Sequence, residues 1–130
     1  MPTTQPPKQI LVAPSPRTVS DIFSSEDLNR LRAIGRVHIH ESEPFNDEHF
    51  NETGANADII IGQIDLPESR LQRASALKAI INVEGNFLPN IDYSYCFRNG
   101  IRVLTISPVF AEPVAEAALG MAIDLARGIT

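Results

Sequence analysis

The chain has 130 residues, of which 43% are hydrophobic, and this length and composition suit one domain with an ordinary core. Its formal net charge of −5 argues against a surface for nucleic acid or anionic lipid, because such surfaces need clustered Lys and Arg. The lone Cys96 excludes a disulfide framework, no run approaches the ~20 apolar residues of a membrane span, and we therefore expect a cytoplasmic protein.

The N-terminal part of the chain predicts a strand, a helix and a second strand. Residues 8–14 form an apolar run that is typical of a parallel strand buried on both faces. Residues 24–36 predict a helix, since Ser24 can cap its first turn, apolar residues recur at helical spacing and Gly35 can end it. Residues 36–40, RVHIH, alternate polar with apolar side chains, which indicates a strand near the edge of a sheet.

The three histidines are the first candidates for chemistry. His38 and His40 are two residues apart on the predicted strand, so they share a face and could together ligate one metal ion. No third and fourth ligand can be placed there, and a solvated edge strand explains both residues. His49 lies in a polar segment without a nucleophile motif such as GxSxG. The sequence therefore predicts neither a metal site nor covalent catalysis.

Strands and short helices alternate through the middle of the chain. The sequence predicts strands at residues 57–63, 79–83 and 101–106, and short helices at residues 67–76 and 91–98. We expect the strand at residues 79–83 to be the central one. The alternation predicts an α/β fold, a flavodoxin-like doubly wound parallel sheet of about five strands with helices on both faces.

The stretch AIINVEGNFLPNID, residues 79–92, combines a buried strand with a loop. Gly85 allows the backbone to turn there or to approach a ligand closely. Ligands of open parallel sheets bind beyond the carboxyl ends of the strands. We therefore expect a binding site at this loop, with Gln63 contributed by the neighbouring strand end. A surface loop without a ligand is the alternative.

Residues 111–128 predict a long C-terminal helix that is apolar around most of its circumference. The charged residues of this segment fall on one narrow stripe, namely Glu112, Glu116, Asp124 and Arg127. A helix of this kind is buried on more than one side. It packs against a second domain beyond Thr130 or another subunit, or a compact domain buries it alone, or the chain is a fragment with an exposed apolar surface.

Three blocks of sequence carry a resemblance to a known family. They are VEGNFLPNID, the strand GIRVLTI after Asn99, and VAEAALGMAIDLAR from Val114 onward. In this order and spacing, residues 58–127 resemble the N-terminal substrate domain of the NAD(P)-dependent D-isomer-specific 2-hydroxyacid dehydrogenases, which include phosphoglycerate dehydrogenase. No single block is specific, and the residues before 58 add only a compatible pattern of strands and helix.

The resemblance implies a role for the loop. In the family this loop usually reads Gly-x-Gly-x-Asp-x-Ile-Asp, and its backbone amides bind the substrate carboxylate. Gly85 matches the first glycine, whereas Phe87 replaces the second and Pro89 replaces the aspartate. Phe110 lies where several members carry an Asn, and two aromatic residues suggest a bulkier or more apolar substrate. The expected substrate-binding residues are Gln63, Glu84, Gly85, Asn86, Phe87 and Phe110.

The resemblance also implies an enzyme that interconverts a D-2-hydroxy acid and a 2-oxo acid by hydride transfer with NAD or NADP. The family's catalytic Arg, His and Glu are expected after this segment, and the seven glycines nowhere form the GxGxxG turn of a nucleotide site. The chain is thus expected to hold no catalytic, cofactor or metal site and to be inactive alone.

The same resemblance divides the chain. Residues 1–110 are expected to form the substrate domain, and residues 111–130 a hinge and dimerisation helix that leads to a missing nucleotide-binding domain. We expect a homodimer formed through residues 111–128, with a small 2-hydroxy or 2-oxo acid as the ligand. Two other functions fit the residues, a stand-alone carboxylate-binding flavodoxin-like module and a dimeric interaction domain whose loop binds no ligand.

Overall fold

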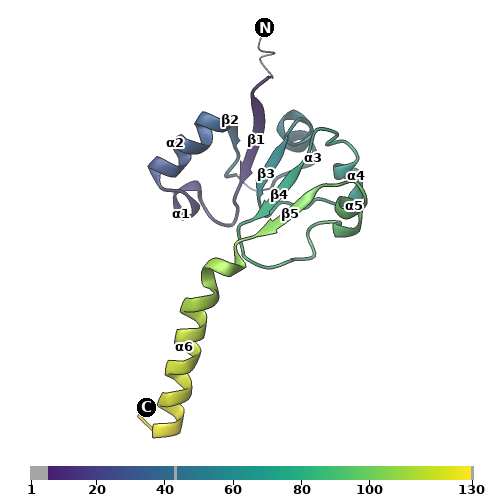
Figure 1. Ribbon diagram of the computed structural model, residues 1–130. Helices are drawn as coiled ribbons and strands as arrows, with labels where there is room; N and C mark the ends of the chain where they lie inside the picture. The colour runs from purple at the N-terminus through teal and green to yellow at the C-terminus, as the bar shows by residue number, and fades with distance from the viewer. Residues whose placement is uncertain (1–5, 43, 130) are drawn as a thin grey trace.

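The computed structural model describes residues 6–42 and 44–129. Within this part of the chain, five strands form one sheet: β1 (Lys8–Ala13), β2 (Gly35–Ile39), β3 (Ile59–Gly62), β4 (Ala79–Asn82) and β5 (Arg102–Thr105). All neighbouring strands are parallel and their order is β2-β1-β3-β4-β5 (Figure 1). This is the 2-1-3-4-5 order of flavodoxin-like sheets, so the predicted parallel α/β sheet is confirmed.

The positions of two strands test the sequence predictions separately. The alternating RVHIH segment lies in β2, which is an edge strand as expected. The strand at residues 79–83 is not central, because β3 occupies the middle of the sheet and β4 lies next to the other edge. The three consecutive isoleucines that begin at Ile59 fit the central place, since a strand buried on both faces is apolar at successive positions.

One face of the sheet is covered by α3 (Asp47–His49), the π-helical turn η1 (Phe50–Gly54), α4 (Glu68–Leu71) and α5 (Tyr93–Arg98). Its core joins the fully buried Leu11, Ile60 and Ile80 of three neighbouring strands to Phe50 and Cys96 of the covering helices. Because all five side chains are almost inaccessible to water, this face is a complete hydrophobic layer.

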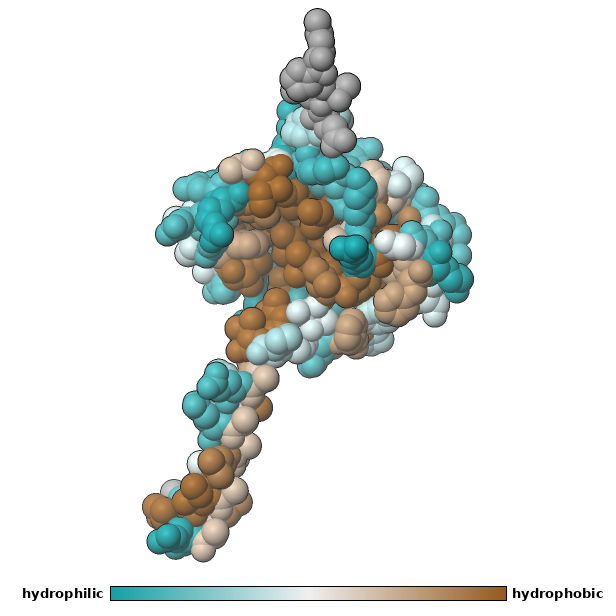
Figure 2. Space-filling view, viewed as in Figure 1, coloured by the Kyte–Doolittle hydropathy of each residue, from teal (hydrophilic) through white to brown (hydrophobic). Residues whose placement is uncertain are grey.

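The other face is covered by α1 (Val19–Ile22) and α2 (Ser25–Ile34). The register places Val12, Ile61, Ile81 and Leu104 in one row across this face. Val12 is fully buried and Ile61 is 5% exposed, but Leu104 is 49% exposed. The two helices therefore cover only part of this face. Figure 2 shows the remaining apolar surface as a brown area between α1 and α2 on one side and β5 on the other.

Helix boundaries differ from the sequence predictions at two places. The helix expected at residues 67–76 is only α4, because backbone bonds from Ala74 N to Leu71 O (3.1 Å) and from Leu77 N to Ala74 O (3.0 Å) form successive tight turns instead. Leu71, Ala74 and Leu77 are all buried by these turns, which repeat every three residues. The helix expected at residues 24–36 ends at Ile34, with Gly35 as its C-cap as predicted. Gly35 also begins β2, where a Cβ atom would lie 2.4 Å from Lys8 O.

The last helix, α6 (Ser107–Arg127), begins earlier than expected and extends away from the sheet (Figure 1). It contains no buried residue. Its exposed large apolar side chains are Val109, Phe110, Val114, Leu119, Met121, Ile123 and Leu125. No helix in the described part of the chain is both long enough and apolar enough to span a membrane.

Candidate functional site

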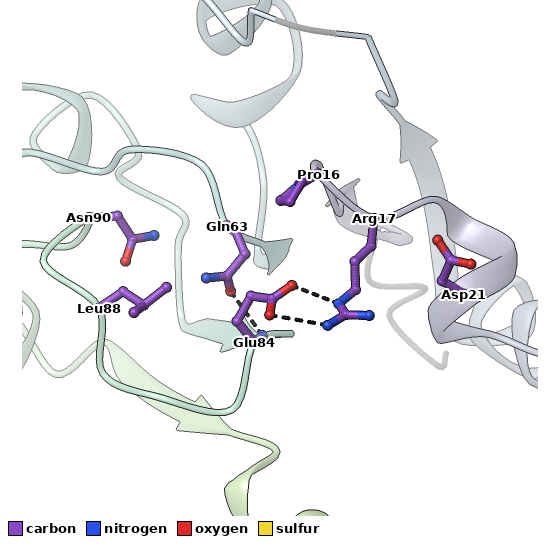
Figure 3. Close-up of a pocket in the computed structure, with 7 residues that line it drawn as sticks. All are labelled: Pro16, Arg17, Asp21, Gln63, Glu84, Leu88 and Asn90. Atoms are coloured by element: carbon purple, nitrogen blue, oxygen red, sulfur yellow. Dashed lines mark hydrogen bonds and ion pairs between the residues drawn. The ribbon is translucent and has the colours of Figure 1, made fainter.

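The carboxyl ends of β1, β3 and β4 lie together at one end of the strands, as the parallel pairing requires. An open cleft of about 660 Å³ lies there (Figure 3). Its lining comes from the loop between β1 and α1, from α1 itself, from the end of β3 and from the loop after β4. The lining residues are Pro16, Arg17, Asp21, Gln63, Glu84, Leu88 and Asn90. The cleft is where the topology of an open parallel sheet places a ligand.

Gln63 joins two strand ends at this cleft. Its side-chain Oε1 accepts hydrogen bonds from Val83 N at 2.9 Å and from Glu84 N at 3.3 Å. Two N–H donors fix the orientation of the amide, because a flipped Gln63 would turn its own NH₂ group toward them. The structure thus brings Gln63 to the predicted loop. No acceptor among the described residues bonds to the buried Nε2 of Gln63.

Glu84 is held by an arginine that the sequence did not point to. Arg17 Nε donates to Glu84 Oε1 at 2.6 Å and Arg17 Nη2 donates to Oε2 at 3.3 Å, so the pair is bidentate (Figure 3). The hydrogen bond from Arg17 to Glu84 and the charge of Glu84 raise the pKa of Arg17. A lone carboxylate at this loop would repel an anionic ligand, and Arg17 offsets that charge.

Gly85 has the positive φ that the loop needs. Its φ of 77° is in the left-handed region, which a residue with a side chain rarely adopts. A Cβ atom at Gly85 would also lie only 3.5 Å from the ring of Phe110 at the start of α6. The loop therefore turns at Gly85 and passes against the first turn of α6. The sequence analysis predicted that the backbone could turn at this glycine.

The next two residues offer backbone donors. No oxygen among the described residues accepts a hydrogen bond from the amide N–H of Asn86 or Phe87. The Asn86 carbonyl accepts from the side chain of the buried Asn82 at 3.3 Å, which ties the loop to the end of β4. Free N–H groups held in this way suit a carboxylate ligand.

Four predicted residues do not line the cleft, namely Gly85, Asn86, Phe87 and Phe110. Asn86 is exposed, and Phe87 is 64% exposed with its ring edge-to-face against Tyr93 at 5.5 Å between centroids. Phe110 lies in an adjoining apolar groove of about 400 Å³ on the incompletely covered sheet face. This groove shares Arg17 and Asp21 with the cleft and also has Ile81 and Ile106 in its lining. The structure therefore groups Gln63 and Glu84 in the cleft and places the two aromatic residues beside it.

Five residues of the cleft were missed by the sequence predictions, namely Pro16, Arg17, Asp21, Leu88 and Asn90. Asp21 accepts hydrogen bonds from Thr18 N at 2.7 Å and from the Thr18 hydroxyl at 2.9 Å, and these bonds lower its pKa. Asn90 Nδ2 donates to Ile64 O at 3.0 Å. The strand order is the signal that could have pointed to Pro16, Arg17 and Asp21, because β1 and β3 are neighbours and the segments that follow them lie side by side.

The remaining chemical candidates are far less suited to catalysis. His38 Nε2 lies 2.9 Å from Gln9 Oε1, and the rings of His40 and His49 are 4.3 Å apart. In residues 6–42 and 44–129, no group of three or more His, Cys, Asp or Glu residues is placed to hold a metal ion. Burial raises the pKa of the Cys96 thiol to about 11, so it is not a thiolate nucleophile at neutral pH.

Comparison with known proteins places this geometry in context. No protein-family model and no curated protein sequence matches the chain. Among solved structures, a phosphoglycerate oxidoreductase from Rhizobium etli matches 95% of the chain with a TM-score of 0.73 and 41% sequence identity. The chain is thus similar to part of a 2-hydroxyacid dehydrogenase. This similarity confirms the resemblance predicted from the sequence.

Other solved structures share the fold. The PH0520 protein from Pyrococcus horikoshii matches 96% of the chain with a TM-score of 0.71 and 27% identity. The NAD⁺-bound 3-phosphoglycerate dehydrogenase of Entamoeba histolytica matches 90% of it with a TM-score of 0.60 and 22% identity. The chain spans 38%, 35% and 39% of the Rhizobium, Pyrococcus and Entamoeba proteins, respectively.

Two of the similar structures contain a nicotinamide nucleotide, NAD⁺ in one and NADP in the other. Besides the NAD⁺-bound Entamoeba enzyme, they include an NADPH-dependent glyoxylate/hydroxypyruvate reductase from Sinorhizobium meliloti in complex with NADP and malonate. This reductase matches 90% of the chain with a TM-score of 0.62 and 20% identity, and the chain covers 34% of it. NAD(P) use is therefore found among the 2-hydroxyacid dehydrogenases that share this fold.

Proposed function

We propose that this chain is the substrate-binding part of an oxidoreductase that interconverts a D-2-hydroxy acid and a 2-oxo acid with NAD or NADP. The observation that carries the proposal is the 41% identity to a phosphoglycerate oxidoreductase over 95% of the chain, which spans 38% of that protein. In this proposal, residues 1–110 form the substrate domain, and residues 111–130 form a hinge toward a nucleotide-binding domain.

The residues of the chain do not fit a nicotinamide nucleotide. In a dinucleotide-binding βαβ unit, a glycine-rich turn after the first strand lets the backbone approach the pyrophosphate. The corresponding turn after β1 is Pro14-Ser15-Pro16-Arg17, which has two prolines and no glycine. The proposed enzyme would hold its nucleotide outside this chain, where the nucleotide supplies or accepts the hydride. We propose that the catalytic residues also lie elsewhere and that the chain is inactive alone.

Within this proposal the chain orients the substrate. The free N–H groups of Asn86 and Phe87 bind the substrate carboxylate, and the Arg17–Glu84 ion pair removes the repulsion that Glu84 would otherwise exert. Gln63 fixes the loop from the neighbouring strand. Holding the substrate in one orientation lowers the barrier to its reaction by proximity, without any proton transfer by this chain.

Phe87→Pro tests the carboxylate site, because proline keeps a side chain at this position but has no N–H donor. We measure reduction of 2-oxo acids by the full-length protein that contains this chain, by following consumption of NADH or NADPH. A hydrogen bond to a charged group contributes about 1.5–3 kcal/mol, so we expect KM to rise by roughly tenfold or more.

Phe87→Ala is the matched control, since it keeps the N–H and loses only an exposed ring. We expect its KM to stay within roughly threefold of the wild-type value, because exposed side chains contribute little. Equal KM increases in both variants would assign the effect to the ring and remove the amide site from the proposal. A full-length protein that reduces no 2-oxo acid would refute the function itself.

We also propose that the protein is a homodimer formed through residues 111–128. The support is the exposed apolar surface of α6, which runs along most of the helix, together with the absence of any buried residue in it. Apolar patches of this size are typical of protein–protein interfaces.

A further inference from the structure

The charges that line the strand-end cleft are unbalanced. Its lining contains one cation, Arg17, and two carboxylates, Asp21 and Glu84. The hydrogen bonds from Thr18 lower the pKa of Asp21 and so favour its charged form. Glu84 is ion-paired with Arg17. The cleft therefore has a net negative lining, although the proposed substrate is itself an anion.

Glu84 already offsets the charge of Arg17. The Nε and Nη2 atoms of Arg17 both bond to Glu84, which occupies one of the two sides of the guanidinium group that bind carboxylates in a bidentate manner. Figure 3 shows Glu84 between Arg17 and Gln63, with the Arg17 guanidinium turned toward the Glu84 carboxylate. A substrate with a second carboxylate or a phosphate therefore meets an arginine whose charge Glu84 already offsets, and it would have to displace Glu84 to bind Nε and Nη2 together.

The other polar atoms of the cleft are neutral. Val83 N and Glu84 N fix the Gln63 amide, and Ile64 O fixes the Asn90 amide, so the orientation of each is set by the backbone. The remaining Gln63 Nε2 and Asn90 Oδ1 atoms have no partner among the described residues. A donor and an acceptor without charge suit an uncharged part of a substrate rather than a second anion.

We propose that Glu84, by occupying Arg17, restricts the substrate to a 2-hydroxy or 2-oxo acid with one anionic group. This inference rests on the proposed function and names its substrate class. A phosphoglycerate-type substrate carries a phosphate as well as a carboxylate, so this chain would differ in specificity from the relative named for that substrate. The discrimination comes from the net negative lining that Glu84 leaves by offsetting Arg17, and an unfavourable environment for the competing ligand is a common route to specificity.

The expected size follows from the interaction of two charges. At an effective dielectric constant of about 40 and a separation of about 6 Å, like charges repel by an energy that changes a rate or binding constant roughly tenfold. We therefore expect the wild-type protein to discriminate by about this factor between two substrates that differ only in one added charge.

The experiment compares 2-oxopentanoate with 2-oxoglutarate, in which a carboxylate replaces the terminal methyl group. We measure kcat/KM for both acids with the full-length protein and form the ratio of monoanion to dianion. The wild-type ratio should be roughly tenfold or higher. Glu84→Gln removes the charge at nearly constant shape and frees Arg17, so the ratio should fall about tenfold through a gain for 2-oxoglutarate.

Two further variants make the result specific. Arg17→Gln leaves Glu84 unpaired, so both substrates should lose kcat/KM and the dianion should lose more. Glu52→Gln removes the same charge from an exposed residue of η1 outside the cleft lining and should leave the ratio unchanged. Unfolding curves confirm that each variant is folded before kinetics are compared.

The outcomes separate this inference from the proposed function. Reduction of both acids with a ratio near one, or a ratio that Glu84→Gln does not change, would overturn the role of Glu84 and leave the dehydrogenase proposal standing. Reduction of neither these acids nor any other 2-oxo acid would refute the dehydrogenase proposal, and the substrate inference would fail with it. A ratio that falls about tenfold in Glu84→Gln, with the Glu52→Gln ratio unchanged, is the result that supports it.

Discussion

The two faces of the sheet are built from the same strands but are closed to different extents. On the face under α3, α4 and α5, Leu11 and Ile60 lie in one row and neither is more than 1% exposed. On the face under α1 and α2, the row that starts at the buried Val12 ends at Leu104, which is 49% exposed. The first face is a complete core layer, and the second is a partial one.

The difference matters because α6 is also uncovered. The incomplete face and α6 together expose large apolar side chains, including Leu104 near the sheet edge and Leu119 on the helix. Burying apolar surface contributes about 25 cal/mol per Å², so both regions gain if another surface covers them. The closed face is expected to carry the stability of the domain, and the open face with α6 is expected to carry its associations.

The largest predicted effect is a matched pair of Leu→Ala changes, one on each face. Leu11→Ala removes a fully buried side chain and should lower the free energy of unfolding by about 3–4 kcal/mol, because the cavity adds to the lost burial. Leu104→Ala should cost about 1 kcal/mol or less, since the side chain is half exposed. Urea unfolding of both variants measures the difference. Equal losses would mean that the open face is covered in solution.

The second prediction concerns the exposed helix. Leu125→Glu places a charge on the apolar side of α6, opposite Glu116, and should weaken the proposed homodimer by about 2 kcal/mol, or roughly thirtyfold in its dissociation constant. Sedimentation velocity over a range of concentrations measures the change. Glu116→Gln, on the charged stripe of the same helix, serves as the control with little expected effect. A wild-type protein that stays monomeric at every concentration would remove the dimer proposal.

The same contrast explains which parts of the fold were predictable. The strands were recognised because successive apolar residues such as Ile59 and Ile60 have few alternatives to a buried strand. Helix α1 was missed because four residues are too few to show a helical period. Helix α4 was predicted too long because Leu71, Ala74 and Leu77 repeat every three residues, which suits tight turns as well as a helix.

The candidate site also contains residues that the sequence could predict and residues that it could not. Gln63 was predictable because it follows directly after a buried strand, and ligands bind beyond such strand ends. Arg17 was not predictable, because its contact with Glu84 joins residues 67 positions apart and depends on β1 lying beside β3. A charged residue in one loop becomes a functional candidate only when the fold shows which charge it faces.

The smallest predicted effect concerns Asp58, which lies just before β3 at the amino end of the sheet and contacts the start of β1. Asp58 Oδ2 accepts a hydrogen bond from Gln9 N at 2.9 Å, and this bond, together with the nearby Lys8, lowers the pKa of Asp58 despite partial desolvation. A pKa that is lower in the folded state than in the unfolded state means that the ionised carboxylate stabilises the fold. That stabilisation is present above the unfolded pKa of about 3.9 and is lost as the pH falls through the folded value.

Asp58→Asn should therefore destabilise the protein most near neutral pH, and its difference from wild type in free energy of unfolding should shrink as the pH falls from about 5 to about 3. Urea unfolding across this range measures the difference. Lys8→Met separates the two causes, because the Gln9 N–H bond is the larger one and should preserve most of the pH dependence. A pH dependence that disappears in Lys8→Met would make the ion pair, rather than the backbone bond, the main link between β1 and Asp58.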